Sequence, residues 1–128
     1  MKIVGIVGWK NSGKTYFASK IINKLKTKNY RIASIKHAHH EFEIDHKGTD
    51  SFIHREAGSS QVIVSSSKRW AKITELNNCK EQTLNDLLKQ LNETDIVIVE
   101  GFKNDNHPKI EIIKKGSNHH LFNKISNI

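Results

Sequence analysis

The chain has 128 residues, of which 36% are hydrophobic, enough for one core and inconsistent with a disordered chain. The net charge is +8, but the basic residues are scattered and form no arm, so nucleic acid is not predicted as the main ligand. No apolar stretch approaches the roughly 20 residues of a membrane span, and Cys79 has no partner for an intramolecular disulfide. We therefore expect a cytoplasmic protein with a single domain over residues 1–128.

Short apolar segments predict strands, and segments of helical periodicity alternate with them. The predicted strands are residues 2–7, 31–36, 61–65, 69–76, 95–100 and 109–114. The predicted helices are residues 14–28, 51–57 and 81–92, with Asp50 as the N-cap of the second helix and Gly58 as its end.

Two of the predicted strands, 2–7 and 95–100, lack polar alternation and are expected at the centre of a parallel sheet. Residues 61–76 contain two strands close enough to pair as an antiparallel hairpin at the edge of that sheet. The pattern predicts a three-layer α/β fold of the P-loop NTPase type, with a mostly parallel central sheet and helices on both faces.

Residues 8–15 match the phosphate-binding pattern G-x-x-x-x-G-K-[ST]. Glycines allow a backbone whose amide hydrogens point inward, and the start of the next helix adds positive charge. Lys14 is expected to reach the β- and γ-phosphates of a nucleoside triphosphate, and the Thr15 hydroxyl to bind Mg²⁺. The predicted nucleotide-binding residues of this loop are Gly8, Trp9, Lys10, Asn11, Ser12, Gly13, Lys14 and Thr15. Because the pattern lies between an apolar strand and an amphipathic helix, it indicates a P-loop nucleotide-binding protein.

Carboxylate ligands for Mg²⁺ are expected at the carboxyl ends of neighbouring strands. Glu100 ends the strand 95–100 and is the first candidate. Asp50 follows the second strand and is the next candidate, with a role as a helix cap as the alternative. Lys36 ends the second strand, where it is either a further phosphate-binding cation or a solvated lysine.

The chain contains eight histidines, several of them in the loop after the second predicted strand. His37, His39 and His40 lie too close together to converge on one Zn²⁺ without distant partners, so contact with phosphate or a partner is favoured over a metal site. The histidines expected to be exposed are His107, His119 and His120.

Several unusual segments, in this order along the chain, resemble the molybdopterin-guanine dinucleotide biosynthesis adaptor (MobB) family. They are I-K-H-A-H-H at 35–40, D-x-x-G-x-D-S at 45–51, H-R-E-A-G at 54–58, R-W-A at 69–71, V-E-G-F-K at 99–103 and H-P-K-I-E at 107–111. A generic P-loop protein does not need these segments, so the resemblance is specific and covers almost the whole chain.

The resemblance implies a GTP-binding protein of the SIMIBI class of P-loop proteins, often a homodimer, with weak GTP hydrolysis. Such a protein assists the molybdenum cofactor guanylyltransferase (MobA-type), which joins GMP from GTP to molybdopterin. A similar layout in the dethiobiotin synthetases implies Thr15, Asp50 and Glu100 as Mg²⁺ ligands and Lys36 as an extra phosphate contact. Lys14 and Glu100 are then the candidate catalytic residues, with water attacking the γ-phosphate in line.

The sequence also departs from related patterns. Trp9 stands where some SIMIBI ATPases have an activating lysine, and no N-K-x-D guanine motif is present, so GTP over ATP rests on the resemblance. The family pattern continues past Ile128, so we expect either a truncated chain or an incomplete base pocket. Arg55 and Arg69 are the candidates for an arginine finger. Two alternative functions are a small-molecule kinase or ligase on the same scaffold and, less favoured, a nucleic-acid-binding ATPase.

Overall fold

The computed structural model describes residues 1–39 and 41–128, which form two compact units. The larger unit consists of Met1–His39 and Thr83–Ile128, and the smaller unit lies within residues 40–82. None of the helices in the described residues is long and apolar enough to cross a membrane.

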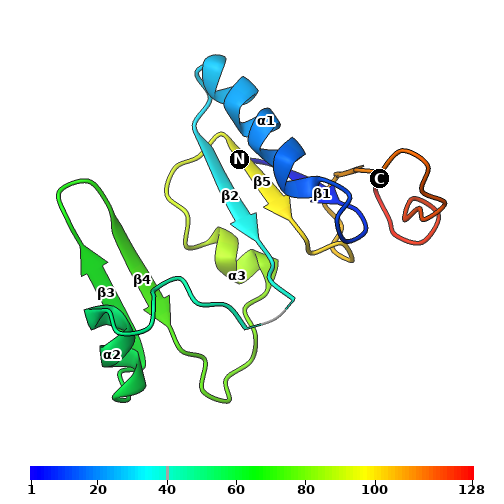
Figure 1. Cartoon of the computed structure of the whole chain (residues 1–128). Helices are drawn as coiled ribbons and strands as arrows, with labels where there is room; N and C mark the ends of the chain where they lie inside the picture. Colours follow the sequence, from blue (N-terminus) through cyan, green and yellow to red (C-terminus); the bar gives the residue numbers. More distant parts are fainter. Residues whose placement is uncertain (40) are drawn as a thin grey trace. The chain divides into compact units, whose positions relative to one another are not determined.

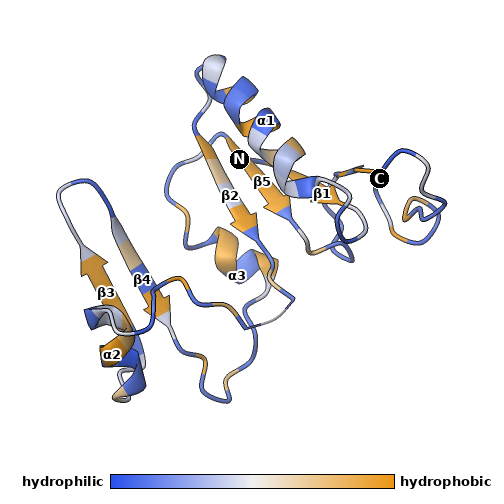
Figure 2. Cartoon of the chain, viewed as in Figure 1, coloured by the Kyte–Doolittle hydropathy of each residue, from blue (hydrophilic) through white to orange (hydrophobic). Residues whose placement is uncertain are grey.

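A four-stranded parallel sheet, ordered β2-β5-β1-β6, forms the centre of the larger unit (Figure 1). Its strands are β1 (Lys2–Val7), β2 (Ile32–Lys36), β5 (Ile96–Glu100) and β6 (Lys109–Glu111). The two strands without polar alternation, β1 and β5, occupy the central positions, as predicted. Burial on both faces of the sheet explains why these strands are continuously apolar, a pattern visible in Figure 2.

Helices cover both faces of this sheet. Helix α1 (Lys14–Thr27) buries Ala18 against Ile6 and Ile98, and α3 (Leu84–Leu88) buries its two leucines on the other face. The leucines of α3 pack against Val97 and Val99. Successive residues of β5 therefore alternate between the two cores, as strand geometry requires. The predicted α/β fold, with a parallel sheet between helices, is confirmed.

Helix α3 is shorter than the predicted 81–92. A reciprocal capping box between Thr83 and Asp86 starts the helix, because each side chain accepts from the other residue's backbone amide. Beyond Leu88 the backbone tightens, and the amides of Gln90 and Leu91 bond three residues back.

The smaller unit contains α2 (Asp50–Glu56) and an antiparallel pair of strands, β3 (Gln61–Ser65) and β4 (Trp70–Thr74). The predicted hairpin is present, but it forms a two-stranded sheet of its own and does not extend the central sheet. Asp50 is the first helical residue rather than the predicted N-cap. Thr49 is the cap, because its extended backbone lets its carbonyl accept from the Ile53 amide at 2.9 Å.

Candidate functional site

The loop between β1 and α1 has the geometry that its two glycines allow. Gly13 precedes the helix at φ 96°, in the left-handed region where a side chain is strained. A Cβ atom at Gly8 would lie 2.6 Å from the backbone oxygen of Ile112 and 2.7 Å from Ser12 Oγ. Ser12 Oγ is itself buried and has no hydrogen-bond partner within the described residues. The loop therefore leaves no room for a side chain at Gly8.

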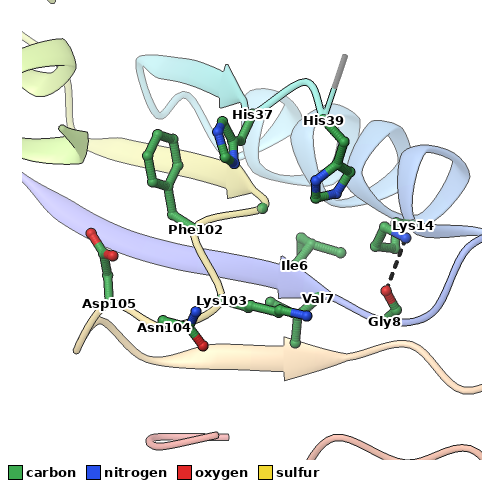
Figure 3. Close-up of a pocket in the computed structure, with 11 residues that line it drawn as sticks. Ile6, Val7, Gly8, Lys14, His37, His39, Phe102, Lys103, Asn104 and Asp105 are labelled. Carbon is green, nitrogen blue, oxygen red and sulfur yellow. Dashed lines mark hydrogen bonds between the residues drawn. The ribbon is translucent and has the colours of Figure 1, made fainter. Parts of the chain in front are cut away.

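Lys14 reaches back over this loop. Its Nζ donates hydrogen bonds of 3.0 Å to the carbonyl oxygens of Gly8 and Trp9, and Figure 3 shows the bond to Gly8. These two bonds hold the Lys14 ammonium against the backbone of the loop. The amides of the first turn of α1 have no partner within the helix, which leaves them available to an anion.

Thr15 and Glu100 meet at the carboxyl edge of the sheet. The Thr15 hydroxyl donates a 2.8 Å hydrogen bond to Glu100 Oε1, and Lys36 Nζ lies 3.8 Å from the same oxygen. Strand alternation explains this arrangement, since Ile98 packs on the α1 face and Glu100, two residues on, points to the same face. The register also pairs Lys36 directly with Glu100. The structure thus brings together four of the predicted site residues: Lys14, Thr15, Lys36 and Glu100.

The donor set at this position suits Mg²⁺. A hydroxyl and a carboxylate oxygen within 2.8 Å of each other are the hard oxygen ligands that this ion prefers. Glu100 is only 14% exposed, so its charge is poorly solvated and gains from a nearby cation.

Two other predicted residues, Asp50 and Arg55, belong to the smaller unit. Asp50 begins α2, and its role as a metal ligand stays a prediction. The Arg55 guanidinium makes ion pairs with three carboxylates, those of Glu43, Asp45 and Glu75. The hydrogen bonds that Arg55 donates to Asp45, Glu75 and Glu43 raise its pKa above the usual value. An arginine held in this way is not a free arginine finger.

The remaining predicted residues of the phosphate loop differ in their surroundings. Lys10 is exposed, and Asn11 is exposed with a left-handed backbone at φ 60°. Trp9 is 45% exposed, its ring centroid lies 5.1 Å from that of His119, and the Lys124 ammonium lies 6.0 Å from it. The segment after β6 therefore packs against the phosphate loop.

Two of the three histidines predicted to be exposed are not. Both ring nitrogens of His107 are buried without a hydrogen-bond partner, and so is Nδ1 of His120. Gly5 makes space for the His107 ring, because a Cβ there would lie 2.5 Å from its Nε2. Burial, together with the charge of Lys109, lowers the pKa of His107. No sequence pattern predicts this burial, since His107 lies in a polar segment. Of the histidine loop after β2, His40 lies outside the described residues.

A pocket of about 250 Å³ opens beside Lys14 (Figure 3). Its polar and aromatic lining residues are Lys14, His37, His39, Phe102, Lys103, Asn104 and Asp105. The rings of His37 and Phe102 stack with centroids 4.5 Å apart. The sequence prediction missed Lys103, Asn104 and Asp105. The available signal was their place directly after Glu100 and Gly101, at the carboxyl end of a central strand.

A parallel sheet whose first strand leads through this loop into a helix, with Thr15 and Glu100 paired beside it, defines a P-loop protein. The family model for molybdopterin guanine dinucleotide synthesis protein B, MobB, matches residues 3–128. The chain therefore belongs to the MobB family.

Curated relatives agree with this assignment. The chain is 44% identical over 110 residues to the molybdopterin-guanine dinucleotide biosynthesis adapter protein of Haemophilus influenzae, a match that covers 84% of the chain and 61% of that protein. It is 35% identical over 119 residues to the adapter protein of Escherichia coli, covering 91% of the chain and 68% of that protein. The chain thus spans about three fifths of the length of the first of these relatives.

Solved structures of the family share the fold. The crystal structure of Bacillus subtilis MobB matches with a TM-score of 0.74 and 29% identity, over 91% of the chain and 70% of that structure. A MobB homologue from Bacillus stearothermophilus matches with a TM-score of 0.75 over the whole chain and 74% of that structure. Its 22% identity shows a common fold only.

Proposed function

We propose that this chain binds GTP with Mg²⁺ and acts as an adapter in the synthesis of molybdopterin guanine dinucleotide. The observation that carries the proposal is the 2.8 Å hydrogen bond between Thr15 and Glu100, beside the Lys14 ammonium. This bond brings a hydroxyl beside the phosphate loop together with a carboxylate, and binding of a metal-bound triphosphate requires both groups at this position. Guanine as the base is supported by the dinucleotide that the family's name contains.

Each residue has a distinct role in this proposal. The amides of residues 9–15 and the Lys14 ammonium bind the β- and γ-phosphates, exchanging the bonds of Lys14 to the loop carbonyls for bonds to phosphate. Thr15 and Glu100 would hold Mg²⁺. When bound, this ion supplies positive charge that neutralises the phosphate oxygens. Lys36, 3.8 Å from Glu100, adds a further cation at the γ-phosphate side.

Hydrolysis is expected to be slow. The chain has three arginines, Arg31, Arg55 and Arg69. Arg31 pairs with Glu93 and Asp95, and Asp95 precedes β5 at the amino-terminal edge of the sheet, whereas Arg55 is held by three carboxylates. Arg69 alone has no ion pair within the described residues. With Arg31 and Arg55 engaged by carboxylates, Arg69 is left as the candidate arginine finger, and an in-line attack of water on the γ-phosphate without that contact lacks a large part of the usual rate enhancement.

As an adapter, the chain would act through its nucleotide state on a partner of the MobA type, a guanylyltransferase that joins GMP to molybdopterin. A homodimer is the expected form. Because Lys14 and Thr15 begin α1 and Glu100 ends β5, bound nucleotide links these two elements and is able to change the surface that the partner meets.

The test is a pull-down of the guanylyltransferase with the full chain, with and without Mg²⁺–GTP. The proposal predicts association that increases with Mg²⁺–GTP and is lost in Lys14→Ala. The control variant is Lys114→Ala, which removes an exposed lysine outside the site and should behave as the original chain does. Equal capture with and without nucleotide would contradict the adapter role.

A further inference from the structure

The pocket beside Lys14 is distinct from the phosphate loop itself. Of the loop residues, it is lined only by Gly8 and Lys14, and it extends away from them to Asp105. A nucleotide lying over the amides of the loop and the start of α1 leaves this pocket available to a second ligand. Its volume of about 250 Å³ is near the lower end of small-molecule sites and suits a compact ring system.

One end of the pocket is cationic. Lys14 lies there, and the Lys103 side chain runs along β1 toward Val7, as Figure 3 shows. Lys103 forms no hydrogen bond or ion pair within residues 1–39 and 41–128. Neither ammonium has a carboxylate partner in the described residues, and with Lys14 engaged by the nucleotide, Lys103 favours a ligand with a phosphate group.

The other end carries an uncompensated carboxylate. Asp105 is half-buried, and its side-chain oxygens accept no hydrogen bond in the described part of the chain. Asn104 lies next to it in the lining. A carboxylate can accept two parallel N–H bonds from a ligand edge that carries an amino group next to a ring N–H. The carboxylate of Asp105 has no such donor within the described residues, so this end suits an amidine-like edge.

Aromatic side chains line the pocket between its cationic end and its carboxylate end. The stacked rings of His37 and Phe102 have an interplanar angle of 23° and both line the pocket. Phe102 is fixed in place by an unusual backbone, since Gly101 has φ 106° and Phe102 itself has φ 48°. A Cβ atom at Gly101 would lie 2.7 Å from His37 Cβ, so glycine is needed for this close stacking. The stack leaves the ring edges of the pair and the face of Phe102 that His37 does not cover for contact with an aromatic ligand.

We infer that this pocket binds a phosphorylated pterin, a flat heterocycle with an amidine-like edge and a phosphate, beside the bound nucleotide. Lys103 binds the phosphate, at the end of the pocket where Lys14 contacts the nucleotide, the ring packs on the His37–Phe102 pair and Asp105 accepts from the amino edge. The inference rests on the proposed function, because molybdopterin in the family's name is such a compound. It involves binding only, and no bond is made or broken in this pocket.

The probe is hydroxymethylpterin phosphate, whose own fluorescence reports binding through its anisotropy. The full chain, saturated with Mg²⁺–GTP, should bind the probe saturably and should bind unphosphorylated hydroxymethylpterin at least about tenfold more weakly. Lys103→Ala and Asp105→Asn should each weaken binding of the phosphorylated probe by about tenfold. The matched controls Lys114→Ala and Glu56→Gln, which alter exposed residues outside the pocket, should leave it unchanged.

The guanine ring shares the amidine-like edge of a pterin, so the measurement also separates these two sources. Two results would assign the pocket to guanine and overturn the inference. One is displacement of the probe by Mg²⁺–GTP. The other is a loss of GTP affinity in Asp105→Asn that equals the loss of probe affinity. Absence of probe binding in a chain that binds Mg²⁺–GTP would overturn the inference and leave the proposed function standing. Absence of GTP binding would overturn both.

Discussion

The Thr15 hydroxyl donates a 2.8 Å hydrogen bond to Glu100 Oε1, although 85 positions separate the two residues in the chain. Parallel pairing of β1 with β5 makes this possible, because it places the carboxyl ends of both strands at one edge of the sheet. Glu100 then points to the face that α1 covers. The chain thus builds a metal-binding pair from two elements that are distant in sequence.

Replacement of Glu100 by glutamine should weaken the Mg²⁺-dependent part of GTP binding. The amide keeps the size of the side chain but removes its charge, and loss of a group that holds a metal costs on the order of 10-fold or more in affinity. Titration calorimetry with GTP, with and without excess EDTA, measures the effect. In Glu100→Gln, EDTA should change GTP affinity little, whereas in the control Glu56→Gln it should weaken binding strongly. A full EDTA effect in Glu100→Gln would rule out the assigned role.

A methyl group at Gly8 should destabilise the fold and impair nucleotide binding. The added Cβ would lie 2.6 Å from the Ile112 carbonyl oxygen, a backbone atom that cannot move freely. The expected cost is about 1–3 kcal/mol of unfolding free energy, as for other overpacked positions. Gly116→Ala is the matched control, because its Cβ would have no neighbour within 4 Å and only its φ of 81° opposes the change. Equal urea midpoints for the two variants would contradict this explanation.

Lys109→Met should lower stability by roughly 2–4 kcal/mol, because the carbonyl oxygens that accept from its buried ammonium are left without a donor. Lys109 is 5% exposed, and its Nζ donates to the carbonyl oxygens of Asp105, His107 and Ser126. Lys109 therefore ties the loop after β5 to the segment after β6. Urea unfolding, with Lys114→Met as an exposed control, measures the difference. A loss no larger than that of the control would show that these bonds contribute little.

Replacement of Arg55 by methionine should reverse the acid dependence of the smaller unit. A hydrogen bond from Arg55 holds the pKa of Asp45 below its usual 3.8, so the pair contributes stability above that pH and loses it as the pH falls further. Without Arg55, the carboxylates of Glu43, Asp45 and Glu75 lose their shared cation and repel one another. The variant should then lose stability as the pH rises from about 4 to about 7.

Hydrogen exchange of the β3–β4 amides across this pH range provides the measurement for Arg55. Arg69→Met serves as the control, since Arg69 is exposed and its side chain forms no ion pair within the described residues. Protection that rises with pH in Arg55→Met, as it does in the control, would contradict the role of these three carboxylates.

Much of the site follows from local sequence rules. The glycines and Lys14 mark the phosphate loop, and period-two alternation along β5 is enough to place Glu100 on the α1 face. Helix α3 is shorter than the predicted helix because a capping pair sets its start and a tightening turn sets its end. The leucine spacing, from which the helix is predicted, marks neither of these two boundaries.

Other features depend on contacts that no local rule contains. Lys109 is buried because Ser126 and the loop before β6 supply carbonyl oxygens, although a lysine is ordinarily expected at the surface. The ring nitrogens of His107 are buried because Gly5, on a neighbouring strand, leaves space for the ring. The hairpin was expected at the edge of the central sheet, but alternation predicts strand pairing only within 61–76 and gives no register with another strand.

The measurement that tests the central claim most directly is titration calorimetry of the full chain with GTP and Mg²⁺, repeated for Lys14→Ala. The loop geometry predicts saturable binding by the original chain and a loss of about tenfold or more when the ammonium is removed. Failure of the original chain to bind either GTP or ATP with Mg²⁺ present, or equal GTP affinity in Lys14→Ala, would contradict the assignment of this loop as a nucleotide site.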